Sequence, residues 1–180
     1  MKVINLINGP SAGKSTVTTG LMSKMKDLGY NIEYVPEVAK GYTWEGNKTA
    51  LSCQQLLFGE QFYELYKLRD KVEAVVTDTS LLLCPFYAKK YNLFGYSEEF
   101  VQFCINQFNL FDNIVVYLHR DPNRPYNPAG RNQSMEEAKA LDQEIMDFIR
   151  SYGIKVYEVQ RTSPVEQVIN EIYKLYNELL

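Results

Sequence analysis

The fold is decided by one stretch near the N-terminus, Val3-Ile4-Asn5-Leu6-Ile7-Asn8-Gly9-Pro10-Ser11-Ala12-Gly13-Lys14-Ser15. Its first five residues are mostly apolar and predict a short, buried parallel strand. Turn-forming residues follow, and we expect a helix from Lys14 to about Gly29, because glycine commonly ends helices. A strand, a glycine-containing turn and a helix in this order predict a phosphate-binding loop.

The loop departs from the usual pattern G-x-x-x-x-G-K-[ST] at one position, where Asn8 stands in place of the first glycine. Asparagine tolerates left-handed backbone better than most residues, so we expect the replacement to be mild. A chance match is the alternative, and the strand and helix on either side disfavour it. The predicted nucleotide-binding residues are Asn8, Gly9, Pro10, Ser11, Ala12, Gly13, Lys14, Ser15 and Thr16.

Two side chains of this loop have predicted roles in chemistry. The Lys14 ammonium is expected to reach the β- and γ-phosphate oxygens, while main-chain N–H groups and the positive end of the helix surround the phosphates. The Ser15 hydroxyl is the expected magnesium ligand. The loop therefore predicts ATP and Mg²⁺ as cofactors.

An acid, Asp78, ends the apolar run Ala74-Val75-Val76-Thr77. In nucleotide-binding domains of this kind, an aspartate that ends a strand beside the phosphate loop holds magnesium directly or through water. Asp78 is therefore the second candidate for the metal site. The alternative is an aspartate that caps a helix, since Thr79 and Ser80 open the next segment.

A second acid, Glu37, follows the predicted strand 31–35 and Pro36. The carboxyl ends of strands line the ligand crevice of an α/β sheet, so Glu37 is expected near the phosphate loop. There it could accept the proton of an attacking hydroxyl or orient that hydroxyl; a solvated glutamate is the alternative. Tyr42 and Trp44 could stack on a planar ring or serve in packing.

The segment from His119 to Gln133 contains three prolines and three arginines (Arg120, Arg124 and Arg131), which is typical of a functional loop. An arginine that closes over the transferring phosphoryl group would stabilise its charge. We therefore predict a lid over about 119–133, with Arg124 and Arg131 as catalytic candidates. Solvated charges on a surface loop are the alternative.

The rest of the chain alternates between strand and helix patterns. This alternation predicts an α/β fold, with a five-stranded parallel sheet and helices on both faces, in a single domain covering residues 1–180. The strands expected after the first are 31–35, 74–77, 113–118 and 154–159, and the helices expected after the first are 51–72, 97–110, 134–153 and one with a cap at Ser163 and Pro164 at its first position.

Composition excludes several classes of protein. The formal net charge of −3 disfavours a protein that coats nucleic acid, and the single histidine, His119, excludes a multi-histidine metal site. The three cysteines form no CxxC pair, which indicates reduced thiols. No run approaches the roughly 20 apolar residues of a membrane helix, and no export signal is visible, so we expect a cytoplasmic protein.

Several short motifs, in order, resemble the P-loop kinase domains of the nicotinamide-riboside-kinase type and their small, often viral, relatives. The matching segments are Gly9–Ser15, Glu37–Lys40 (where the family often has arginine at the position of Lys40), Asp78-Thr79, Phe94-Gly95, Phe111-Asp112, Pro125-Tyr126 and Gly130-Arg131. Ala129 stands where the family commonly has an acid before that glycine. Glu37 and Asp78 also resemble the acidic pair of deoxynucleoside kinases.

The resemblance implies a P-loop kinase fold in which Glu37 is the preferred base and Arg131 the preferred lid arginine. The expected function is transfer of the γ-phosphoryl group of ATP to a small nucleoside- or nucleotide-like acceptor. Two alternatives stay open: a P-loop ATPase or switch protein, and a kinase that acts on a hydroxymethylated base in DNA. The acidic net charge disfavours the DNA acceptor, and the sequence leaves the oligomeric state open.

Overall fold

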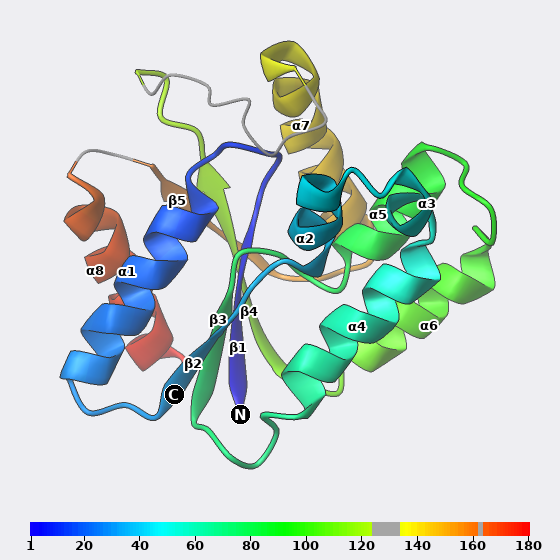
Figure 1. The fold of residues 1–180 in the computed structure, drawn as a ribbon. Coiled ribbons are helices and arrows are strands. Elements are labelled where there is room, and N and C mark those ends of the chain that lie inside the picture. Colours follow the sequence, from blue (N-terminus) through cyan, green and yellow to red (C-terminus); the bar gives the residue numbers. More distant parts are fainter. Residues whose placement is uncertain (124–133, 162–163) are drawn as a thin grey trace.

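The five predicted strands pair into one parallel sheet in the computed structural model, which describes residues 1–123, 134–161 and 164–180 (Figure 1). The spatial order of the strands is β2-β3-β1-β4-β5, so β1 and its phosphate loop are central. The strands are β1 (Lys2–Ile7), β2 (Ile32–Val35), β3 (Ala74–Thr77), β4 (Asp112–His119) and β5 (Val156–Gln160). The predicted sheet is confirmed, and its ends shift by no more than two residues.

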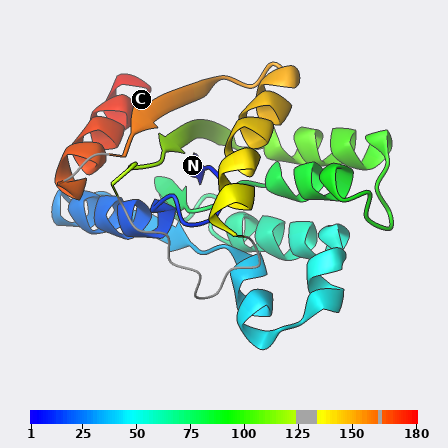
Figure 2. The same ribbon diagram turned by 90° about the horizontal axis from the view of Figure 1, so that it is seen from above.

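Both faces of the sheet are buried because apolar side chains of β1 point to alternate sides. Val3 and Ile7 belong to a core that also contains residues of α4 to α7, whereas Ile4 and Leu6 belong to a second core with α1 and α8. Figure 2 shows α1 and α8 together on one side of the sheet and α4 to α7 on the other. The near-continuous apolar run in β1 therefore reflects burial on two faces.

Eight helices surround the sheet in the described part of the chain. They are α1 (Lys14–Asp27), α2 (Val38–Glu45), α3 (Lys48–Ser52), α4 (Gln54–Tyr66), α5 (Leu83–Lys90), α6 (Glu98–Phe108), α7 (Met135–Ser151) and α8 (Val165–Glu178). The Ser97 hydroxyl accepts a hydrogen bond from the N–H of Phe100 at the start of α6. Ser134 and Glu137 form the predicted capping box of α7.

Three details of the helix prediction are wrong. The segment predicted as one helix over 51–72 is divided, because the chain leaves helical geometry at Cys53 between α3 and α4 and again after Tyr66. The short helices α2 and α5 were not predicted. Pro164 occupies the N-cap position of α8, one residue before its predicted place, and Ser163 lies outside the described residues.

The sheet brings the candidate residues to one edge. β1 and β2 both pair with β3, and Asn5 and Val35 are both in register with Thr77. The segments that follow these three strands therefore emerge side by side, carrying the phosphate loop, Glu37 and Asp78. In the described residues, no helix has the length and apolar character needed to cross a membrane.

Candidate active site

The phosphate loop takes its shape from left-handed backbone at two residues. Ser11 has φ 65° and Gly13, the N-cap of α1, has φ 93°. Asn8 does not have a left-handed backbone. The expectation that asparagine replaces the first glycine of the loop because it tolerates that conformation is therefore wrong. Gly13 has no side chain to cap α1, and the first N–H groups of a helix lack intrahelical acceptors, which leaves them suited to an anion.

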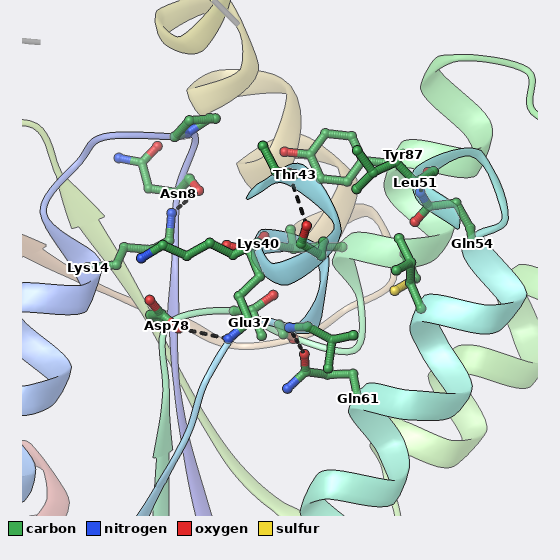
Figure 3. A pocket seen from close by; sticks show the side chains of 18 of the residues that line it. Asn8, Lys14, Glu37, Lys40, Thr43, Leu51, Gln54, Gln61, Asp78 and Tyr87 are labelled. Carbon is green, nitrogen blue, oxygen red and sulfur yellow. Dashed lines mark hydrogen bonds between the residues drawn. The ribbon is translucent and has the colours of Figure 1, made fainter. Parts of the chain in front are cut away.

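Asn8 acts through its side chain instead, which is buried. Its Nδ2 donates to the carbonyl oxygen of Leu118 on β4 at 2.6 Å, and its Oδ1 accepts from the N–H of Gly9. A glycine could make neither bond. The Lys14 Nζ donates to the carbonyl oxygens of Asn8 (2.8 Å) and Gly9 (3.0 Å), so the lysine lies along the loop (Figure 3).

A further tether joins the loop to α7, and the sequence did not reveal it. The N–H of Gly9 also donates to Oδ1 of Asp142 at 3.1 Å. The same carboxylate receives the Nε and Nη2 of Arg120, at the end of β4, and Nη2 also reaches the carbonyl oxygen of Ala138. A Cβ on Gly9 would lie 2.4 Å from that Asp142 oxygen and 2.6 Å from the Ala138 oxygen, so only glycine fits.

The two predicted metal ligands lie in contact. The Ser15 hydroxyl donates to Oδ2 of Asp78, whose side chain is only 2% exposed. The other Asp78 oxygen accepts from the Tyr34 hydroxyl (3.0 Å) and from the N–H of Glu37 (3.2 Å). Burial, and next the charge of Asp78, raise the pKa of Tyr34, so that hydroxyl stays a donor. These bonds fix the carboxylate and leave one oxygen beside Ser15.

This donor set fits magnesium. Mg²⁺ prefers oxygen ligands and is commonly bound by one or two carboxylates together with substrate phosphates and water. Ser15 and Asp78 supply a hydroxyl and a carboxylate beside the phosphate loop. Within residues 1–123, 134–161 and 164–180, no group of three or more His, Cys, Asp and Glu side chains gathers at one place, so the phosphates would complete the shell.

Glu37 lies where the chain turns from β2 into α2, as the N-cap residue of that helix. Gln61 of α4, a buried residue that sequence reasoning missed, fixes this turn: its Oε1 accepts from the N–H of Val38 (3.0 Å) and its Nε2 donates to the carbonyl oxygen of Pro36 (3.2 Å). Figure 3 shows Glu37 beside Asp78 and above Gln61, and Glu37 lines the cleft. The predicted meeting of Glu37, Asp78 and the phosphate loop is therefore observed.

One cleft of about 680 Å³ is lined by the phosphate loop together with Glu37, Gln61 and Asp78. Its volume lies within the usual range for small-molecule sites. The phosphate loop lines one half, and the other half is lined mainly by apolar and aromatic side chains, namely Leu51, Leu57, Leu83, Cys84, Tyr87, Tyr91 and Leu93. Figure 3 shows Glu37 between Asp78 on one side and Leu51 and Tyr87 on the other. Burial raises the pKa of the Tyr87 hydroxyl, and the charge of Glu37 raises it further.

The aromatic residues of this cleft are not the expected ones. Tyr87 and Tyr91 line it, whereas Tyr42 and Trp44 are not among its described lining residues. The Tyr42 hydroxyl donates to Glu60 of α4 (2.8 Å), so this tyrosine serves in packing, and Trp44 is 64% exposed. Arg124 and Arg131, the two predicted lid arginines, lie outside the described residues.

The fold and this edge of the sheet define a P-loop nucleotide-binding domain. A family model described as an AAA domain, AAA_28, matches residues 3–167, and the chain belongs to this family. A search among curated proteins gave no significant match. Solved structures with low sequence identity share the fold.

Deoxyadenosine kinase from M. mycoides, solved with dCMP and a flexible dCDP, aligns over 99% of this chain and 100% of its own, with 21% identity and a TM-score of 0.63. YorR from Bacillus subtilis, in complex with phosphorylated GDP, aligns over 97% of this chain and 95% of its own, with 20% identity and a TM-score of 0.60. Shikimate kinase from Aquifex aeolicus gives 21% identity over 100% and 99%, with a TM-score of 0.53. The predicted P-loop kinase fold is confirmed, while the nicotinamide-riboside-kinase type stays a prediction.

Proposed function

We propose that this protein is a magnesium-dependent kinase that transfers the γ-phosphoryl group of ATP to a small nucleoside- or nucleotide-like acceptor. One observation carries the proposal: the cleft that contains the phosphate loop continues past Glu37 into a second, largely apolar half. An ATPase that only switches between nucleotide states needs the first half alone. A kinase needs room for an acceptor beside the γ-phosphate, and this cleft provides it.

The residues divide between the two substrates. Lys14 and the main-chain N–H groups of the loop bind the phosphates, and Ser15 and Asp78 hold magnesium, which neutralises charge on the β- and γ-phosphates. Glu37 orients the acceptor hydroxyl and accepts its proton as the new O–P bond forms and ADP leaves. Arg124 and Arg131 belong to the proposed lid over 119–133.

Gln54 supports a nucleobase in the acceptor half. Its side chain lines the cleft and is only 5% exposed. The Nε2 donates to the carbonyl oxygen of Leu51 (2.8 Å), while the buried Oε1 has no hydrogen-bond partner among the described residues. A buried acceptor without a donor is costly, and an N–H group of a base would satisfy it. The nucleosides and nucleotides named with the M. mycoides and B. subtilis structures agree with this class of acceptor.

The cellular setting and domain organisation complete the proposal. We place the protein in the cytoplasm, as a single kinase domain, since ATP is abundant there and all three cysteines are free thiols. The acceptor is a free small molecule, since the net charge of −3 disfavours a nucleic-acid substrate.

The test is transfer of labelled γ-phosphate, with Mg²⁺, to a panel of nucleosides, nucleoside monophosphates, nicotinamide riboside and DNA with hydroxymethylated bases. We expect ATP consumption that depends on one of the small molecules. Lys14→Ala should abolish transfer, and near wild-type transfer by this variant would refute the whole proposal. Hydrolysis that no acceptor changes would identify a switch ATPase, and labelling of DNA alone would identify a DNA kinase.

The role of Glu37 has its own test. Glu37→Gln should lower kcat by about 100-fold, as expected for the loss of a general base, with an ATP affinity close to that of the wild type. Glu45→Gln is the matched control, since this exposed glutamate ends α2 and is not a lining residue of the cleft. A collapse of ATP binding in Glu37→Gln would assign Glu37 to the magnesium shell instead.

A further inference from the structure

A second lysine faces the phosphate site from the acceptor side. Lys40 lies in the first turn of α2, and its N–H donates to the carbonyl oxygen of Glu37 (3.3 Å), one turn earlier. Both residues line the cleft. Figure 3 shows the Lys40 side chain extending from α2 into the cleft, toward Lys14. Glu37 is the N-cap of the turn that carries Lys40, so the proposed base and this cation enter the cleft from the same turn of the chain.

The Lys40 ammonium has no ion-pair or hydrogen-bond partner among the described residues, although the residue is half-buried. Two other cations near the phosphate loop are held: Lys14 by two carbonyl oxygens of the loop, and Arg120 by Asp142. A partly desolvated cation without a counter-ion is unfavourable by itself. It becomes favourable when the cleft contains an anion.

We infer that Lys40 is a second phosphate-binding cation, which contacts the non-bridging oxygens of the γ-phosphoryl group opposite Lys14. This inference rests on the proposed function and adds a catalytic residue to it. During transfer, the acceptor oxygen forms a bond to the γ-phosphorus, the bond to the β,γ-bridging oxygen breaks, and ADP leaves with the electron pair. Lys40 keeps its proton and stabilises the charge on the transferring group.

The position of Lys40 on α2 distinguishes it from a lid arginine. It is part of a helix whose start is fixed by Gln61, so the ammonium is available before any closure. Its main chain is also tied to that of Glu37. The acceptor hydroxyl and the γ-phosphoryl charge would therefore be positioned by one rigid turn.

The experiment compares the binding of two magnesium–nucleotide probes, ADP and the non-transferable triphosphate analogue AMP-PNP, by titration calorimetry. Lys40→Met retains the aliphatic stem and removes the charge, and Lys40→Arg retains the charge. Lys71→Met is the matched control, because Lys71 is exposed and is not among the described lining residues of the cleft. Melting temperatures close to the wild-type value verify that each variant is folded.

We expect Lys40→Met to weaken AMP-PNP binding by about 10-fold, as for the loss of one charge-assisted contact, while ADP binding changes less than twofold. Lys40→Arg and Lys71→Met should resemble the wild type. Equal losses for both nucleotides, or no loss for AMP-PNP, would overturn the inference. Because these probes need no acceptor, the result stands apart from the transfer panel.

Discussion

Replacing Asp142 with alanine removes a side chain that joins the phosphate loop, the end of β4 and helix α7. Its carboxylate accepts from the N–H of Gly9 and from two nitrogens of Arg120, and the Arg120 Nη2 lies 2.9 Å from Oδ1. The side chains of Arg120 and Asp142 are only 17% and 15% exposed. The variant therefore leaves a mostly buried guanidinium and a main-chain N–H without their acceptor.

The expected loss can be worked out from these contacts. Breaking a fully buried ion pair costs about 3–5 kcal/mol, and we take about 2 kcal/mol because water reaches part of this pair. The N–H of Gly9 loses an acceptor at a further cost of about 1 kcal/mol. A total of about 3 kcal/mol corresponds to a fall in melting temperature of roughly 6–12 °C for a chain of this length.

The assay is denaturant unfolding of the wild type, Asp142→Ala, Arg120→Ala and the double variant, with Asp147→Ala as control. Asp147 lies on the same helix, is exposed and accepts a hydrogen bond from Gln143. The control should change stability by less than about 0.5 kcal/mol. Each single variant removes the same ion pair. The losses of stability of the two single variants, added together, should therefore exceed the loss of the double variant by more than about 1 kcal/mol. Additive losses would refute the reasoning.

Two further predictions follow from the same geometry and from the thiols. Gly9→Ala should lower the affinity for ADP at least 10-fold, because the added Cβ would meet a main-chain oxygen of α7 at 2.6 Å that cannot swing away; Gly59→Ala, in open space on α4, should leave the affinity unchanged by calorimetry. Iodoacetamide at pH 8 should label Cys53, which is exposed, and spare the other two thiols, because burial raises the pKa of Cys84 well above its usual value and that of Cys104 to about 12. Two adducts in the intact mass would contradict this prediction.

The strands were predictable because each is marked by local chemistry. The apolar runs around Ile4, Val75 and Val116 are buried on both faces, which makes their pattern independent of distant contacts. The helices α6 and α7 were marked by caps at Ser97 and Ser134. In contrast, α2 has no buried residue, so it shows no apolar stripe that a periodicity could reveal.

The division between α3 and α4 was not predictable because the apolar pattern is present on both sides of it. The apolar spacing continues across Cys53, where the backbone leaves the helical region (φ −94°, ψ 83°) without a glycine or proline to signal it. The Asn47 side chain caps the start of α3. In the sequence, however, the pair Gly46-Asn47 is equally typical of a loop. Tertiary contacts decide this corner, as they often override local preference.

The site was predictable where its residues follow strands directly. Asp78 directly follows β3, and Glu37 follows β2 after one intervening residue, so the parallel sheet alone brings them together. The partners that fix them were not predictable. Asp142 reaches Gly9 across 133 residues and Gln61 reaches Pro36 across 25, and neither spacing belongs to a local pattern.

The two halves of the cleft are built with different numbers of tethers. The phosphate loop is joined to β4 through Asn8, to α7 through Gly9 and to Asp78 through Ser15, so the sheet and a helix fix it before a nucleotide arrives. Pre-organised donors lower the cost of binding a highly charged triphosphate. The acceptor side depends on α2 and α3, and α2 is joined to α4 by two side chains of α4: Gln61, which accepts from the N–H of Val38, and Glu60, which accepts from the Tyr42 hydroxyl. Changes in those short helices would therefore alter the acceptor while leaving the phosphate loop intact, and this is where we expect related chains to differ in substrate.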